Sequence, residues 1–315
     1  MIACMEDYVF GPVISRRLGR SLGVDPIPQK TCNFNCVYCQ LGRSTPLKNE
    51  RAEYTPAEEV VSQVLNTVES LGNDEIDWVT FGGSGEPTLH SRIGWMIRSL
   101  KDSVDLPVAV LTNGSLLYLP EVREALLPAD AVLPNLDAGS QDLFRRINRP
   151  HPEVTFDRLI EGLVSFREEF SGRLWIEVAL VKGLNDTEEA LEDIAAALDR
   201  IKPDRVHLNQ PIRPPSEIWV EPTDEEGLLR ARAILGEIAH VVHEVEEILD
   251  LSGFRDVVDA IISVVTRHPM SQAEIERALK ERFSGEIDRA LSELESSGRV
   301  KSIDRYGIKF WRSGI

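Results

Sequence analysis

Three cysteines, Cys32, Cys36 and Cys39, lie close together on one short segment of the chain. The CxxxCxxC spacing lets three thiolates bind three corners of an iron–sulfur cube. The only other cysteine is Cys4, so one iron would keep an open coordination position at which a substrate can be activated. Structural zinc is the alternative, but it takes four protein ligands, and only a distant histidine could complete this set. The pattern therefore favours a reactive [4Fe–4S] cluster.

A glycine-rich segment over residues 82–89 follows a predicted strand, and Gly83, Ser84, Gly85 and Glu86 stand at its centre. Glycine lets the backbone approach a ligand closely, and the Glu86 carboxylate can pair with a cation. An ordinary turn after a strand is the alternative. The position of this segment, one strand and one helix after the cysteines, favours a binding loop.

Further polar residues stand at the ends of predicted strands. Barrel-type sites are assembled at the carboxyl ends of parallel strands, so we expect these side chains to face the cavity of the cysteine loop. They are Asn113, Asn135, Asp137, Lys182 and Asn209.

CxxxCxxC with Tyr38 before its last cysteine, followed by the glycine-rich segment, resembles the radical S-adenosylmethionine (SAM) superfamily. The resemblance implies a [4Fe–4S] cluster whose open iron binds the amino and carboxyl groups of SAM. An electron from an external donor such as flavodoxin or ferredoxin then cleaves SAM to a 5′-deoxyadenosyl radical that abstracts a substrate hydrogen. Glu86 would receive the SAM ammonium. The other SAM-contacting residues implied are Tyr38, Gly83, Ser84, Gly85, Asn113, Asn135, Asp137, Lys182 and Asn209.

Segments 11–23, 144–151 and 209–215 resemble a poorly characterised radical SAM branch related to the tRNA 4-demethylwyosine (wybutosine) synthases. Those synthases hold a second cluster on further N-terminal cysteines, whereas this chain has only Cys4 there, so the same reaction is not expected. The resemblance makes arginines candidate phosphate contacts, because the guanidinium group binds phosphate in a bidentate manner. An RNA base and a peptide or small molecule both stay open as substrates. The candidate arginines are Arg16, Arg17, Arg149 and Arg213, with Arg20 and Arg146.

Strands and helices alternate along most of the chain, which is typical of βαβ units and a parallel sheet. Strands are predicted near residues 21–24, 76–81, 107–112, 131–136, 174–181 and 205–209, and Thr55 is expected to cap the first helix. Six strands are too few for a closed eight-stranded barrel. We therefore expect an α/β fold, a partial (β/α)6 TIM-like barrel, as a radical SAM core domain over residues 1–250.

The remaining residues, 251–315, contain three helical patterns and a hairpin around residues 304–307, which predicts a small winged-helix domain. Its third helix would be the DNA-reading helix, but it is mainly acidic, whereas the predicted wing is basic. A protein-interaction module, nucleic-acid contact and a structural role all remain open.

The formal net charge of −17 argues against a protein that coats nucleic acid through bulk electrostatics. No apolar stretch is long enough to span a membrane, and the amino terminus lacks a signal-peptide pattern, so a cytoplasmic location is expected. Two other classes remain: an iron–sulfur redox carrier, and a zinc-dependent regulator. The three-ligand loop argues against the redox carrier, and the glycine-rich segment argues against the zinc-dependent regulator.

Overall fold

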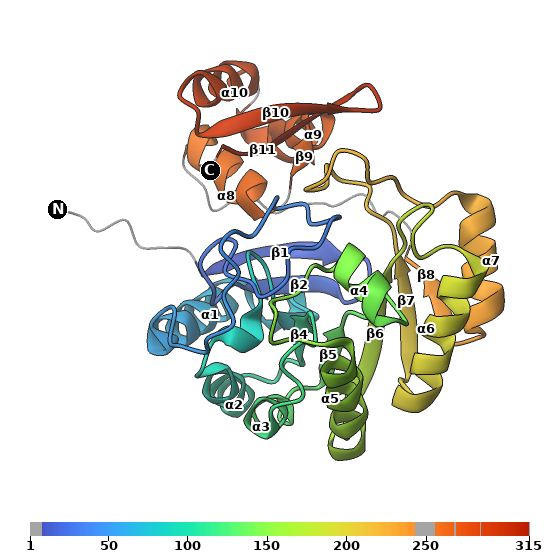
Figure 1. The fold of residues 1–315 in the computed structure, drawn as a ribbon. Helices are drawn as coiled ribbons and strands as arrows, with labels where there is room; N and C mark the ends of the chain where they lie inside the picture. Colours follow the sequence, from blue (N-terminus) through green and yellow to red (C-terminus); the bar gives the residue numbers. More distant parts are fainter. Residues whose placement is uncertain (1–7, 243–255, 268, 284, 315) are drawn as a thin grey trace.

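A computed structural model describes residues 8–242, 256–267, 269–283 and 285–314 (Figure 1). Eight strands form one sheet in sequence order, with β1 antiparallel to β2 and every later neighbouring pair parallel. Among the described residues the sheet is open, with β1 and β8 at its two edges. The strands are β1 (Val9–Ser15), β2 (Gly19–Val24), β3 (Trp78–Phe81), β4 (Val108–Thr112), β5 (Ala131–Pro134), β6 (Arg173–Ala179), β7 (Arg205–Asn209) and β8 (Ala239–Val241).

Helices lie in an arc around the outside of this sheet (Figure 1). Side chains recurring three and four residues apart give each an apolar face; in α1, for example, Val60, Val64 and Val68 are all buried. This packing leaves the inner side of the sheet and the ends of its strands for a site. The helices are α1 (Ala57–Leu71), α2 (Ile93–Ser103), α3 (Pro120–Leu126), α4 (Gln141–Ile147), α5 (Phe156–Glu169), α6 (Glu188–Ile201) and α7 (Glu225–Leu235), with 3₁₀ turns at Asn73–Glu75 and Pro87–Leu89.

The expected alternation is confirmed as a mixed α/β fold with a large parallel sheet, but the count of six strands is wrong. The structure adds β1, whose sequence contains glycine and proline, and β8, which is only three residues long. Thr55 is also not the cap of α1. The cap residue is Pro56, and the Thr55 hydroxyl instead donates to the Pro26 carbonyl at 2.9 Å.

Residues 256–314 form a separate group of elements, here called the C-terminal lobe, which has its own buried core. Three strands form a sheet in the order β10-β11-β9, and Tyr306 and Gly307 turn the β10–β11 hairpin with positive φ values of 55° and 76°. The boundary expected at residue 250 and Cys4 both lie outside the described residues. The elements are α8 (Val257–Arg267), β9 (Met270–Ser271), α9 (Gln272–Phe283), α10 (Ile287–Ser296), β10 (Val300–Arg305) and β11 (Ile308–Ser313).

The described part of the chain contains no helix with the length and apolar character needed to cross a membrane.

Candidate functional site

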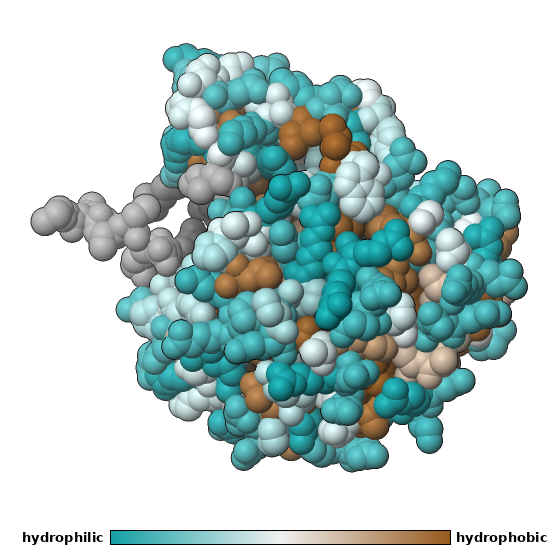
Figure 2. Space-filling model, in the orientation of Figure 1, coloured by the Kyte–Doolittle hydropathy of each residue, from teal (hydrophilic) through white to brown (hydrophobic). Residues whose placement is uncertain are grey.

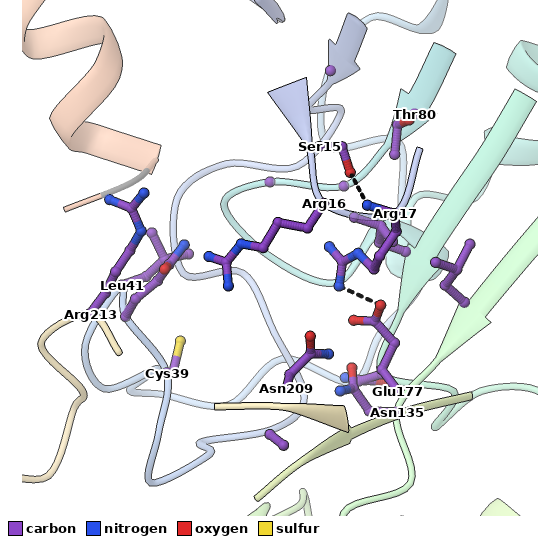
Figure 3. A pocket seen from close by; sticks show the side chains of 18 of the residues that line it. Ser15, Arg16, Arg17, Cys39, Leu41, Thr80, Asn135, Glu177, Asn209 and Arg213 are labelled. Atoms are coloured by element: carbon purple, nitrogen blue, oxygen red, sulfur yellow. Dashed lines mark hydrogen bonds and ion pairs between the residues drawn. The ribbon is translucent and has the colours of Figure 1, made fainter. Parts of the chain in front are cut away.

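A cavity of about 450 Å³ opens on the inner side of the sheet, at the ends of the strands (Figure 3). All three cysteines of the CxxxCxxC loop line it, together with Glu86 from the glycine-rich segment. The loop between β2 and α1 carries the cysteines, and the loop after β3 carries the glutamate. The cavity therefore unites the two strongest motifs of the sequence.

Backbone and side-chain hydrogen bonds hold the cysteine loop in place. The Ser216 hydroxyl donates to the Cys36 carbonyl at 2.8 Å, and the Lys48 amide donates to the Cys32 carbonyl at 2.9 Å. Two side-chain amides reach thiols, from Asn113 to Cys32 at 3.7 Å and from Asn148 to Cys36 at 3.5 Å. Such contacts to ligating sulfurs fix their orientation and tune the bound centre.

Burial raises the pKa of all three thiols, that of Cys32 to about 12. The free thiols are therefore protonated at neutral pH, and a metal centre must displace these protons to bind.

The thiols fit a cluster better than a single ion. Within the described ranges, no three histidine, cysteine, aspartate or glutamate side chains are placed to hold one metal ion. Each cysteine of a cubane cluster binds a different iron, so its thiols need not meet at one point.

Glu86 is a buried acceptor on the cavity wall. Its Oε1 accepts from the Thr88 amide at 3.0 Å and from the hydroxyls of Thr88 and Thr112 at 2.5 and 2.6 Å. Its Oε2 accepts from the Asn113 amide at 2.7 Å. Burial raises the pKa of Glu86, although these donors favour its ionised form. Because Oε2 accepts from no other group in the described part of the chain, it is the oxygen with room for a cationic group.

Packing explains the glycines of the glycine-rich segment. A Cβ on Gly83, where φ is +143°, would lie 2.7 Å from the Asp25 carboxyl carbon, and one on Gly85 would lie 2.2 Å from the Thr31 carbonyl oxygen. Gly83 and Gly85 line the cavity. Ser84, in contrast, is buried behind the wall, and its amide donates to the Asp25 carboxylate. Ser84, which was expected to contact SAM, is thus not among the residues that line the cavity.

Asp137 also lies behind the wall, where it orients a residue that lines the cavity. The Tyr38 hydroxyl donates to Asp137 Oδ2 at 2.5 Å, and the amides of Asn148 and Ala179 complete its bonding at 2.7 and 2.8 Å. Burial raises the pKa of Asp137 to about 6. Tyr38 lines the cavity, so Asp137 acts through it.

The other strand-end residues divide into two groups. Asn113, Asn135 and Asn209 line the cavity as expected. Lys182 does not: its ammonium group pairs with Asp224 at 3.0 Å, and its side chain is half exposed. Lys182 follows the end of β6, at Ala179, and is not among the residues that line the cavity.

Only some of the candidate arginines lie at the cavity. Arg16, Arg17 and Arg213 line the cavity, and Figure 3 shows them reaching in from two segments above Cys39. Arg149, expected to contact RNA, instead pairs with Glu217.

Arg149 and Arg146 border a separate depression together with Leu184 and Trp219. The face of the molecule over α4 is strongly hydrophilic (Figure 2). Arg20 pairs with Asp77, away from the cavity.

Glu177, Asn148 and Asp25 are site residues that the sequence analysis missed. Glu177 lies inside the cavity, paired with Arg17 and 3.8 Å from His207. Burial opposes its ionisation, but Arg17 and His207 outweigh that effect and lower the pKa of Glu177. Asn148 belongs to the segment 144–151, where the arginines drew attention, while nothing in the sequence marks Asp25 or Glu177.

Known proteins that match the chain identify its family. The family model of the radical SAM superfamily matches residues 27–198, more than half of the chain. A UPF0026 protein of Methanocaldococcus jannaschii is 33% identical over 312 residues, covering 97% of this chain and 96% of that protein. A protein of Brachyspira hyodysenteriae named GTPase Obg is 39% identical over 93% of this chain, but the chain spans only 43% of its length.

The solved structure of a radical SAM methyltransferase from Sphaerobacter thermophilus shares the fold, with a TM-score of 0.53 and 21% identity, over 70% of this chain and 65% of that one. With the cysteine loop and glycine-rich segment on one cavity, these matches assign the chain. It belongs to the radical SAM superfamily, whose members are enzymes that bind a [4Fe–4S] cluster and SAM.

Proposed function

We propose that this enzyme holds a [4Fe–4S] cluster on Cys32, Cys36 and Cys39, cleaves SAM reductively, and starts hydrogen abstraction from a substrate. The observation that carries the proposal is that the three thiols and Glu86 line one cavity. A redox carrier would need a saturated cluster and no ligand wall beside it.

Cys32, Cys36 and Cys39 would hold the cluster, which when bound would supply the one electron needed to cleave SAM reductively and start hydrogen abstraction. The residues of the protein bind and position SAM. Glu86 Oε2 would receive the SAM ammonium. The backbone amide of Asn113 donates to the Glu86 carboxylate, and the side-chain amide of Asn113 donates to the Cys32 thiol. Tyr38, fixed by Asp137, forms part of the wall.

For the substrate, we propose an RNA base, with the phosphates of its nucleotide chain bound by Arg16 and Arg213, while Arg17 stays paired with Glu177. This arginine group is the supporting observation, because it lies at the cavity of a chain with a net charge of −17. A peptide or small molecule carrying an anionic group is the second candidate. RNA from cells lacking this gene should accelerate SAM cleavage, whereas acceleration by small anionic metabolites alone would favour the second candidate.

We also propose that residues 1–250 form the catalytic core and that residues 251–315 form a winged-helix domain that serves as an interaction module. The separate buried core of the C-terminal lobe supports this division. The electron donor we propose is a flavodoxin or ferredoxin.

Anaerobic reconstitution with iron and sulfide, reduction, and measurement of 5′-deoxyadenosine after addition of SAM tests the reaction. We expect product from the natural protein and from Cys4→Ala, the control cysteine, and none from Cys36→Ala. A well-formed cluster in the natural protein that neither binds nor cleaves SAM would contradict the proposal and favour the redox carrier.

A further inference from the structure

Thr266, Arg267 and Pro269 of the C-terminal lobe contact three loops that build the cavity. The side-chain amides of Gln29 and Gln40 donate to the carbonyls of Thr266 and Arg267, each at 3.3 Å. The Arg213 guanidinium donates to the Pro269 carbonyl. Gln40 directly follows the last cysteine of the cluster loop. The lobe is therefore attached to the walls of the site.

Arg267 extends this contact toward the glycine-rich segment. Its Nε donates to Asp25 Oδ2 at 3.2 Å, and the side chains of Arg267 and Asp25 are only 12% and 5% exposed. The guanidinium carbon also lies 5.1 Å from the centre of the Phe10 ring. A buried charged pair of this kind is held in one geometry by its surroundings, unlike a solvated surface pair.

Asp25 in turn holds the segment that lines the cavity. Both of its carboxylate oxygens accept from the Ser84 amide, each at 3.1 Å. Gly83 packs so tightly against this carboxylate that no side chain fits there. On the other side, the Ser84 carbonyl accepts from the Lys30 amide at 2.7 Å. The conformation of the segment therefore depends on Asp25 staying where it is.

The charge of Asp25 makes Arg267 necessary for this arrangement. Burial raises the pKa of Asp25, whereas Arg267 and the Ser84 amide lower it. Without its cation, a buried carboxylate must take up a proton or move toward water. Either change weakens or displaces its bond to Ser84, two residues before Glu86.

We propose that Arg267 is a positioning residue of the SAM site: through Asp25 it fixes the backbone around Ser84, so that full SAM affinity requires the docked C-terminal lobe. This inference rests on the proposed function, in which the glycine-rich segment binds SAM. Linkage requires the effect to be reciprocal, so SAM binding stabilises the docked lobe.

Equilibrium binding of SAM to the full-length, cluster-loaded protein tests the proposal. We expect Arg267→Met to weaken SAM binding by about tenfold, equivalent to about 1.4 kcal/mol, at unchanged iron content. Arg289→Met is the matched control, because Arg289 belongs to the same lobe and is 84% exposed. Equal affinity of Arg267→Met and the natural protein would overturn the inference. Failure of the natural protein to bind SAM would instead contradict the proposed function.

A double-mutant cycle separates positioning from general damage. Asp25→Asn keeps an acceptor for the Ser84 amide but removes the buried charge, so Arg267→Met should cost clearly less SAM affinity in the Asp25→Asn background. Additive losses would show that Arg267 does not act through Asp25.

Hydrogen exchange of the natural protein gives a readout that needs no variant to fold. SAM should slow exchange of the amides of α8, which ends at Arg267. Exchange in α8 that is unaffected by SAM at saturation would contradict the linkage between the lobe and the site.

Discussion

Asn148 donates its side-chain amide to the Cys36 thiol at 3.5 Å, while the same amide nitrogen also bonds Asp137 at 2.7 Å. Asn148 lies at the carboxyl end of α4, far from the cysteines in sequence, and is buried. Hydrogen bonds to ligating sulfurs are among the features that set the potential of an iron–sulfur cluster. Asn148 thus links the cysteine loop to the residue that orients Tyr38.

We predict that Asn148→Ala lowers the reduction potential of the cluster. Loss of an N–H donor leaves more negative charge on the Cys36 sulfur, which disfavours the reduced cluster. A redox titration followed by electron paramagnetic resonance measures the shift, with the exposed Asn73→Ala as control. A potential equal to that of the natural protein would show that the contact has no electronic effect.

Replacement of Glu86 by glutamine should reduce SAM affinity about 10- to 100-fold, since charged hydrogen bonds contribute about 1.5–3 kcal/mol. The glutamine amide nitrogen can no longer accept from the Asn113 backbone or from an ammonium group. Iron content should stay unchanged because Glu86 is not a cluster ligand. Equilibrium SAM binding measures the effect, and Glu75→Gln, in an exposed turn, serves as control. Unchanged affinity would place the ammonium elsewhere.

The cluster loop and Glu86 were predictable because each is a local motif whose spacing carries the chemistry. Asn113, Asn135 and Asn209 were predictable for a topological reason: parallel strands bring their carboxyl ends together. The same rule placed Lys182 in the cavity wrongly. Lys182 lies in the turn after its strand, and there its ammonium group pairs with the exposed Asp224 outside the cavity.

The residues that sequence reasoning missed are those that act across long separations. Asp25 and Arg267 are 242 positions apart, and no periodicity or motif relates them. In the sequence, Glu177 is an ordinary strand residue, and only the folded structure brings Arg17 into an ion pair with it. The two additional strands were missed because β1 contains Gly and Pro and β8 is too short to show alternation. Their place is fixed by pairing with β2 and β7, which is tertiary information.

Arg17→Met should destabilise the protein by about 3–5 kcal/mol at pH 7, the usual effect of removing one partner of a buried ion pair. The folded-state pKa of Glu177 is lowered, so the pair contributes stability above the unfolded pKa of about 4.5 and loses it as the pH falls through the lower folded value. Urea denaturation at pH 7 and near pH 4 should show the penalty shrinking at the acidic pH. Arg17→Met/Glu177→Gln should recover part of it. A penalty independent of pH would mean that packing, and not charge, is lost.

Gly85→Ala should abolish high-affinity SAM binding, because its Cβ would lie 2.2 Å from the Thr31 carbonyl oxygen and force the segment away from the cysteine loop. The Glu86 amide donates to that same carbonyl at 2.9 Å, so the clash also breaks the bond that places Glu86. Gly72→Ala is the control: Gly72 has a positive φ of 88°, but nothing lies within 4 Å of its Cβ. That variant should lose only about 1 kcal/mol of stability and bind SAM normally. If both variants bind SAM like the natural protein, the glycine-rich segment does not form the SAM-binding wall.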